Sequence, residues 1–345
     1  MRFATPQSAR QVACGCALTL THMLKPDGSF VYRYMLPEPD RTDALYSNIR
    51  HIATIWFLLD VEKAIGPIQG VADAAIKAGD YMMENFFAPY SSDEMLCVLD
   101  EGFAKLGGAG LALNVLCGLY DATSDARYLT PAGKIAAFVL KQRREDGDFV
   151  HVRPYPIGPI HPARSNFFTG QALMGLLSYC QQTRSDYILE VVEDSIAKLD
   201  QQDIGVKTKS HWMLYALEHA YEVKPKPETL QYAQRIANVI LSDKQYRTSG
   251  ALTSIACGTE GLLAFDRLLE VAGQGPSDKS RAGILKQVRQ NLSVMLKFKA
   301  YGGVFFQSRV KPEVRIDYIV HAGLCFLRYA LQAAEGNYPD LTFDS

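Results

Sequence analysis

Arginine, histidine and acidic side chains gather at two places far apart in the chain, each at the predicted start of a helix. The earlier place holds Tyr46, Asn48, Arg50 and His51, and the later one holds Arg315, Asp317, Tyr318 and His321. Asp317 and His321 are four residues apart, so their side chains share one helix face. Arginines bind anionic groups, and an aspartate beside a histidine can take part in proton transfer. The alternative is a buried cluster of salt bridges and hydrogen bonds that ties two parts of the fold together.

Adjacent acids and a glycine pair mark a second candidate region, residues 99–108. Asp100 and Glu101 are followed by Lys105 and then by Gly107 and Gly108, which open a predicted helix. The free backbone N–H groups of such a helix start can bind an anion. The lysine precedes the glycines and no Gly-Lys-Ser/Thr follows, so the segment is not a nucleotide-binding P-loop. The alternative is that the glycines only let the chain pass close to its neighbours.

Three further places supply candidate binding or catalytic groups. Tyr155, His161 and Arg164 stand in a loop with four prolines, which indicate a fixed loop shape, and we predict that they contact a substrate. Trp212 begins another predicted helix and offers an aromatic surface on which sugars stack, with a core tryptophan as the alternative. Glu260 lies near the start of a predicted helix, where an acid also favours the helix dipole. It is therefore either a carboxylate of the site or an ordinary helix-start residue.

The sequence lacks the common motifs for metal binding and nucleophilic catalysis. It contains no HExxH, no CxxC and no two histidines close enough in sequence to indicate a zinc site. The GxSxG motif of serine hydrolases is also absent. We therefore predict no metal and no other cofactor.

Composition limits the class of partner. Hydrophobic residues make up 48% of the 345 residues and charged residues 21%, which is typical of a globular protein with a large core. The net charge is −1, with acids and bases mixed along the chain. No basic cluster indicates nucleic acid or an anionic membrane surface. We expect a small-molecule or oligosaccharide substrate, no nucleic acid and no membrane partner, and we make no prediction of oligomeric state.

The cysteines and the apolar runs of the sequence indicate the cellular compartment. The chain has seven cysteines, an odd number that lies mostly in apolar helical stretches, which is unlike a disulfide framework. The apolar stretch 12–20 follows Arg2 and Arg10 and resembles a short secretory signal, but Gly15 interrupts it. We predict that this stretch belongs to a first outer helix and that the protein is cytoplasmic. No apolar run approaches the roughly 20 residues of a transmembrane helix.

The candidates are positioned by twelve helical segments that pair into six hairpins. The segments are predicted at 5–24, 48–65, 69–87, 109–122, 128–144, 168–183, 186–201, 211–223, 228–242, 255–271, 280–299 and 315–335. The second helix of each pair recurs at steps of roughly 42 to 61 residues, which indicates a repeated unit. Even-numbered segments are apolar or small on all sides, whereas odd-numbered ones carry a polar stripe. We predict an all-α fold, an (α/α)6 toroid formed by residues 1–345 as a single domain, with the even segments inside.

The links between helices alternate in length. The long links enter the inner helices, and three share a glycine–aromatic signature, at residues 26–30, 145–149 and 300–305. Each predicts a tight turn that needs glycine, followed by a short β-like stretch. All six long links fall at one end of the ring, where loops on a rigid scaffold usually carry function. If the ring closes, the first and last hairpins are neighbours, and the two arginine–histidine sets face each other at this mouth.

Six hairpins with glycine–aromatic loops on one face resemble the six-hairpin superfamily of carbohydrate-active proteins. That superfamily includes glycoside hydrolases, unsaturated glucuronyl hydrolases, polysaccharide lyases and N-acylglucosamine 2-epimerases. The resemblance covers nearly the whole chain but is architectural, and no single family's motif set matches residue by residue. It implies that the mouth of the ring binds a saccharide.

The resemblance implies one of several reactions at the mouth. Hydrolysis needs two carboxylates that flank the glycosidic bond, and the candidates are Asp317, Asp100, Glu101 and Glu260. Epimerisation, or a lyase reaction on a uronic acid, needs proton-transfer groups and an arginine, and the candidates are His51, His161, His321, Arg50 and Arg315. We favour a hydrolase acting on an acidic or modified saccharide. A non-enzymatic module that binds a glycan or peptide is the remaining alternative.

Overall fold

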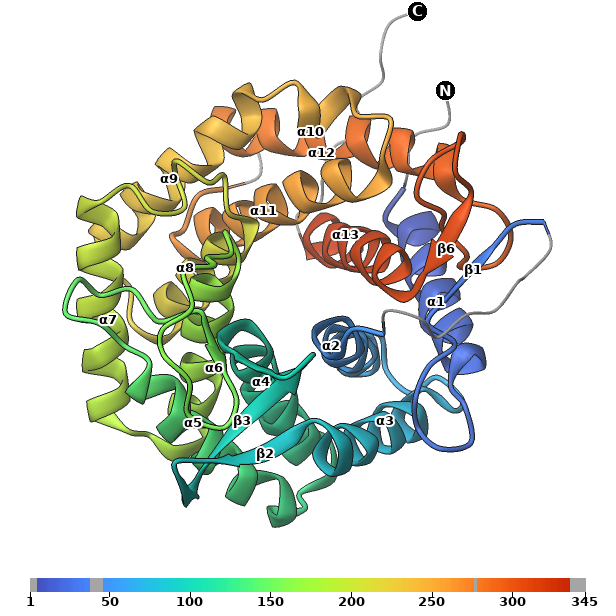
Figure 1. Cartoon of the computed structure of the whole chain (residues 1–345). Helices are drawn as coiled ribbons and strands as arrows, with labels where there is room; N and C mark the ends of the chain where they lie inside the picture. Colours follow the sequence, from blue (N-terminus) through green and yellow to red (C-terminus); the bar gives the residue numbers. More distant parts are fainter. Residues whose placement is uncertain (1–4, 38–45, 276–277, 336–345) are drawn as a thin grey trace, which may run out of the picture.

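The computed structural model describes residues 5–37, 46–275 and 278–335, and its long helices form two concentric rings (Figure 1). The inner ring consists of α2 (Asn48–Ile65), α4 (Leu106–Thr123), α6 (Phe168–Thr183), α8 (His211–Val223), α11 (Leu252–Val271) and α13 (Ile316–Glu335). The outer ring consists of α1 (Pro6–Met23), α3 (Val71–Asn85), α5 (Leu129–Lys141), α7 (Asp186–Gln201), α9 (Pro227–Ser242) and α12 (Lys279–Met295). The short elements η1 (Ala126–Tyr128), α10 (Gln245–Thr248) and η2 (Leu296–Phe298) lie between them in the chain.

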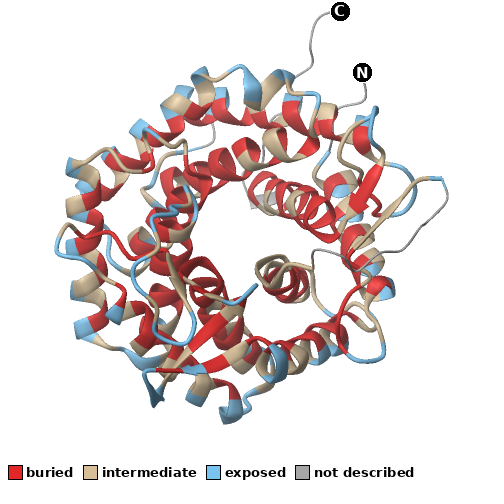
Figure 2. Cartoon of the chain, in the orientation of Figure 1, coloured by how far each residue is buried: buried red, intermediate tan, exposed pale blue. Residues whose placement is uncertain are grey.

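The inner ring is closed. Each inner helix packs on the next, and α13 packs back on α2. The inner helices are buried on nearly every side, whereas the outer helices keep an exposed face (Figure 2). This is the arrangement that the all-round apolar pattern of the even-numbered segments predicts. The predicted (α/α)6 toroid is therefore confirmed.

Glycines allow three of the inner helices to approach closely. A Cβ atom on Gly175 of α6 would lie 2.1 Å from the carbonyl oxygen of Gly110 in α4. A Cβ on Gly170 would lie 2.5 Å from the backbone of Trp212 in α8. A Cβ on Gly107 would lie 2.3 Å from the ring of Phe168. The close-approach explanation of the glycines at the start of α4 therefore has direct structural support.

The glycine–aromatic links form tight turns as predicted. Gly28, Gly147 and Gly302 all have positive φ angles, of 94°, 84° and 51°. In each link the residue before the turn forms a β-bridge with the aromatic residue after it. The backbone therefore needs glycine at these three positions.

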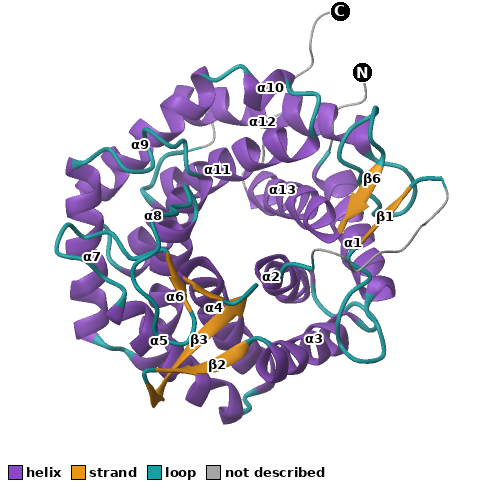
Figure 3. Cartoon of the chain, in the orientation of Figure 1, coloured by secondary structure: helices purple, strands orange, loops and turns teal. Residues whose placement is uncertain are grey.

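Short strands join the loops on one side of the ring (Figure 3). Strand β1 (Arg33–Met35) pairs antiparallel with β6 (Glu313–Arg315), which links the first hairpin to the last. A second sheet contains β2 (Phe87–Tyr90), β3 (Ser92–Asp100), β4 (Phe103–Lys105) and β5 (Val152–Pro154), in that order. Both sheets precede inner helices, so they fix the entrances of α2, α4, α6 and α13.

The predicted helix bounds differ from the structure mainly at inner-helix starts. The fourth segment was predicted from residue 109 but α4 begins at Leu106, because close packing on α6 outweighs the low helix propensity of two glycines. The tenth was predicted from residue 255, and the corresponding α11 begins at Leu252. Within the described residues, every helix is too short or too polar to cross a lipid bilayer.

Candidate active site

The two predicted arginine–histidine sets meet where α2 and α13 lie side by side. The Asp317 carboxylate accepts two hydrogen bonds from Arg315, from Nε at 2.5 Å and from Nη2 at 2.8 Å. The Nε atom of Arg50 lies 3.1 Å from the other side of the same carboxylate. Arg50 is 38% exposed at its side chain, whereas Asp317 is nearly buried. The prediction that the two sets face each other therefore holds for Arg50 and Asp317.

Aromatic residues hold the two arginines in place. Arg50 Nη1 donates a hydrogen bond to the hydroxyl of Tyr32 at 2.5 Å. The guanidinium of Arg315 stacks over the ring of Tyr318 at 4.4 Å, a cation–π contact, and the Tyr318 hydroxyl is bonded to Glu313. Tyr318 is buried, so its role is to support Arg315. Arg50 is the more exposed of the two arginines and the one better placed to meet a ligand.

His321 follows Asp317 by one helical turn and belongs to a buried hydrogen-bonded chain of three side chains. Its Nδ1 atom lies 2.6 Å from a carboxylate oxygen of Glu260 in α11, and the other oxygen of Glu260 accepts a hydrogen bond from Tyr215 in α8 at 2.9 Å. Burial alone would lower the pKa of His321, but the Glu260 carboxylate outweighs it and raises that pKa above its ordinary value. The contact therefore favours the protonated form of His321 and the ionised form of Glu260.

His211, the first residue of α8, faces His321 with the opposite tendency. The ring is 2% exposed and its Nε2 atom has no hydrogen-bond partner. Burial lowers the pKa of His211 to about 4, in spite of the attraction of Glu260. The two imidazole rings lie edge to face with centroids 6.2 Å apart. The pKa values of two neighbouring histidines are therefore shifted in opposite directions, which is the pattern expected of a general base and a general acid.

These histidines are also spaced to hold a metal ion together with Cys257. The donor atoms of His211, Cys257 and His321 all lie within 4.8 Å of one another. A metal would need the Cys257 thiolate, and without a metal burial raises the pKa of that thiol well above its ordinary value. The Nδ1 atom of His321 is bound to Glu260, which leaves its Nε2 atom to face either a metal or a substrate. We interpret the histidines as titrating groups because their pKa values are shifted in opposite directions, and the absence of a metal stays a prediction.

Aromatic side chains surround the histidine pair. Trp212 packs at 5.5 Å from both Trp56 and Tyr215 and is only 5% exposed, so it belongs to the core. The core alternative for Trp212 is therefore the one with structural support. Phe167 lies edge-on to His211 at 5.3 Å and is well exposed. It is the aromatic ring beside the histidines that a ligand can reach.

Several predicted site residues make structural contacts at the inner-helix entrances. His51 is completely buried: its Nδ1 accepts a hydrogen bond from the Tyr46 hydroxyl and its Nε2 donates one to the carbonyl of Ala78. Both nitrogens are thus occupied, and none is left for a substrate. The side-chain amide of Asn48 donates to the carbonyl of Leu99, which ties the start of α2 to β3.

The acids and the lysine of residues 99–108 form their own ion pairs. Lys105 lies 2.7 Å from the nearly buried Asp100 and 3.4 Å from the exposed Glu101. This group sits on the turn between β3 and β4. Asp100 is neutralised by Lys105, which leaves Glu101 alone as an accessible carboxylate there.

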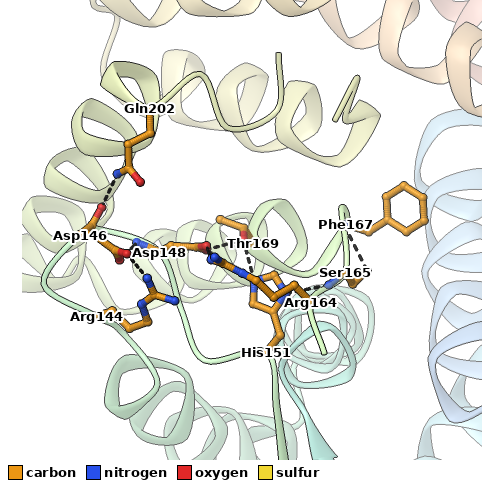
Figure 4. Close-up of polar contacts among 9 residues, drawn as sticks. All are labelled: Arg144, Asp146, Asp148, His151, Arg164, Ser165, Phe167, Thr169 and Gln202. Atoms are coloured by element: carbon orange, nitrogen blue, oxygen red, sulfur yellow. Dashed lines mark hydrogen bonds and ion pairs between the residues drawn. The ribbon is translucent and has the colours of Figure 1, made fainter. Parts of the chain in front are cut away.

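The proline-rich loop places its three candidates apart from one another. Tyr155 is exposed, and His161 packs on Phe103 and accepts a hydrogen bond from the backbone of Ala163. Arg164 forms an ion pair with the buried Asp148 (Figure 4). Arg164 is therefore engaged in holding the loop.

The sequence analysis missed three residues that complete the site. His211 was considered only as the neighbour of Trp212, and Tyr215 and Phe167 were not considered. One signal was available for His211: like the other two candidate sets, it stands at the start of an inner helix, directly after the capping residue Ser210. The contact of Tyr215 with Glu260 spans 45 residues and had no local signal.

Comparison with known proteins supports the fold. No family model matches the chain, and no curated protein matches it in sequence. A sugar epimerase from a ruminal bacterium matches with a TM-score of 0.74 at 11% identity, over 94% of this chain and 98% of that one. The cellobiose 2-epimerase of Bacillus thermoamylovorans gives 0.73 at 11% identity, over 93% and 98%. An α-1,6-mannanase of Salegentibacter gives 0.70 at 10% identity, over 94% and 99%. At these low identities the similarity shows the fold: this chain shares its (α/α)6 toroid with proteins that act on carbohydrates.

Proposed function

We propose that this protein is a sugar epimerase or isomerase, which moves a proton at the carbon beside the carbonyl group of a reducing sugar. The observation that carries the proposal is the pair of facing histidines whose pKa values are shifted in opposite directions. The similarity in fold to a sugar epimerase and a cellobiose 2-epimerase supports the same class of reaction. This is the epimerase alternative of the sequence analysis.

Each group has a chemical role in the proposed reaction. The unpartnered Nε2 of neutral His211 accepts the proton from C2 of the open-chain sugar, and the C–H electron pair forms a C1=C2 double bond. The charge moves to the former carbonyl oxygen, which the exposed guanidinium of Arg50 stabilises. Protonated His321 then returns a proton. Delivery to the opposite face of C2 gives the epimer. Delivery to C1, with transfer of the O2 proton to O1, gives the ketose.

The carboxylates support hydrolysis less well. Glycoside hydrolysis needs two carboxyl groups free to flank the scissile bond. Asp317 is bound by two arginines, and Glu260 is fully buried and bound by His321 and Tyr215. Arg315 is committed to Asp317, and the proposed reaction uses Arg50, so this cluster keeps no further arginine for the carboxylate of an acidic saccharide. The geometry therefore favours a neutral sugar.

The proposal is tested by incubating the protein with neutral monosaccharides, disaccharides and uronic acids in D2O and following the products by NMR. We expect deuterium at C2 together with a second epimer or a ketose. Release of a monosaccharide from a disaccharide without exchange at C2 would identify a hydrolase. Binding without exchange or cleavage would identify a glycan-binding module.

Compartment and domain organisation belong to the same proposal. All seven cysteines are free, which supports a reducing compartment and hence a cytoplasmic enzyme. We also propose that the whole chain acts as one domain, since α13 closes the ring onto α2.

A further inference from the structure

One exposed aromatic ring stands beside the proposed base. Phe167 is 42% exposed, and its ring lies edge-on to His211 with centroids 5.3 Å apart. Single exposed apolar side chains are common, but this one lies directly beside the proposed base, which makes it a candidate surface for a ligand. The C–H face of a pyranose ring is suited to stack on the Phe167 ring, because aromatic rings bury apolar surface well.

A buried carboxylate anchors the segment that carries Phe167. Asp148 is 2% exposed, accepts a hydrogen bond from Thr169 Oγ1 at 2.6 Å and pairs with Arg164 (Figure 4). Burial alone would raise the pKa of Asp148, but hydrogen bonds from His151 and Thr169 lower it to about 2. Asp148 is therefore a permanent anion at the centre of this network.

The network extends from Asp148 to the backbone of Phe167. His151 Nε2 lies 3.1 Å from Thr169 Oγ1, and His151 Nδ1 accepts a hydrogen bond from the backbone N–H of Ser165 at 2.9 Å. The Ser165 hydroxyl then accepts the backbone N–H of Phe167 at 3.2 Å. In Figure 4 the Phe167 ring points away from the residues that hold its backbone. The loop is thus fixed on one side, and the ring is presented on the other.

We propose that Phe167 forms a subsite that binds a closed pyranose ring next to the reacting sugar, and that the Asp148 network positions it. The inference rests on the proposed function. The reacting sugar must be in its open-chain form, which offers no flat C–H face. The ring that stacks on Phe167 is therefore an unreactive unit linked to it, so the substrate is a neutral disaccharide or longer saccharide that reacts at its reducing end.

The test compares a disaccharide with the corresponding reducing monosaccharide, using wild type, Phe167→Ala, Phe167→Tyr and the control Tyr187→Ala. Tyr187 is also an exposed aromatic residue, but it lies on outer helix α7. We expect Phe167→Ala to raise KM for the disaccharide about tenfold with a smaller change in kcat, and Phe167→Tyr to restore it. The preference for disaccharide over monosaccharide should fall in Phe167→Ala and stay at the wild-type value in Tyr187→Ala. An equal loss for both sugars, confined to kcat, would overturn the subsite, because Phe167 would then act only by supporting His211.

The positioning role is tested separately with Ser165→Ala and His151→Gln, at temperatures where both variants are folded by circular dichroism. We expect the same KM effect as in Phe167→Ala but weaker, with the pH profile of kcat unchanged. Variants that melt earlier yet keep the wild-type KM would overturn the positioning role.

Ligand-observed NMR separates this inference from the proposed function. If the disaccharide binds wild type, loses binding in Phe167→Ala and is never turned over, the subsite stands and the epimerase proposal fails. If the disaccharide is turned over with the same KM in both proteins, the epimerase proposal stands and the subsite fails.

Discussion

The two ends of the inner ring differ in the cavity that one of them holds and in the pKa shifts of their titratable groups. The end that holds His211 and His321 lies at the N-termini of the inner helices. At the opposite end, beyond Trp56 and Tyr215, is a cavity of about 690 Å³ lined by residues from the C-terminal halves of five inner helices. The cavity is large enough for a ligand. The pKa shifts of the titratable groups nevertheless distinguish the two ends better than the cavity volume does.

Burial raises the pKa values of two acids that line the cavity. It raises the pKa of Asp60 to about 6 and that of Glu218 to about 8, although Arg328 opposes both shifts. At the histidine end the same burial gives one lowered and one raised pKa, because Glu260 contacts His321 and His211 has no hydrogen-bonded partner at Nε2. Opposed shifts create an acid and a base at the same pH. The comparison shows that a buried carboxylate in contact with one of two neighbouring histidines is what shifts their pKa values apart.

The largest expected effect concerns the histidines themselves. We expect His211→Asn and His321→Asn to lower kcat/KM for epimerisation about 10³-fold, because each removes a proton-transfer group. Glu218→Gln, at the opposite end, should retain activity within about twofold. Equal losses at the two ends, with all variants folded by circular dichroism, would refute the assignment of the site.

Glu260→Gln tests the cause of the opposed shifts. Without the carboxylate, burial dominates and the pKa of His321 falls. Activity that requires protonated His321 is lost as the pH rises through that pKa, so the high-pH limb of the kcat/KM profile should move to lower pH. We expect activity at pH 7.5 to fall relative to wild type as this limb moves to lower pH. An unshifted limb would mean that another group governs it.

Glu218 gives the cavity end a dependence of stability on pH. Its folded pKa, about 8, exceeds its ordinary value of 4.5, so the folded state binds the extra proton. The stability that this proton contributes is fully present below pH 4.5 and is lost as the pH rises through 8. We expect the melting temperature of wild type to fall between pH 6.5 and 8.5 relative to that of Glu218→Gln, by a few degrees. Parallel curves for the two proteins would contradict the raised pKa.

The smallest effect is expected at Glu101. Its side chain is exposed on a β-turn, and its contact with Lys105 is a surface ion pair. Such pairs contribute about 0–1 kcal/mol, so Glu101→Gln should change stability by less than that. Its kcat/KM should stay within about twofold of wild type. A large loss of activity would instead support the hydrolase alternative.

The fold could be predicted from the sequence because its signals are local. Helical periodicity and all-round apolar inner helices recur along the chain, glycine turns recur in three links, and four helices have the predicted bounds, namely α2, α6, α7 and α8. Arg50, Asp317 and His321 could be named because helix starts are recognisable in sequence, and the meeting of Arg50 with Asp317 followed from ring closure. Glu260 was predicted near a helix start, but α11 begins at Leu252, so Glu260 lies in the body of that helix.

The rest of the site depends on contacts between distant segments. The pKa shift of His321 comes from Glu260, 61 residues earlier, and a buried histidine such as His211 has the same sequence pattern as a core residue. Likewise, His51 appeared equivalent to Arg50 in sequence. Adjacent residues on a helix point in different directions, so Arg50 reaches the mouth while His51 is enclosed by Tyr46 and α3.

The antiparallel pairing of β1 with β6 has a consequence for protein synthesis. Arg33 pairs with Arg315, so this ladder, and the contact of Arg50 with Asp317 beside it, joins segments more than 260 residues apart in the chain. A nascent chain emerges N-terminus first at about 5–20 residues per second, so Arg50 is made well before its partner Asp317. His321 is made later still. The first hairpin therefore closes onto the last only after α13 has emerged, and the proposed acid and base come together only at that point.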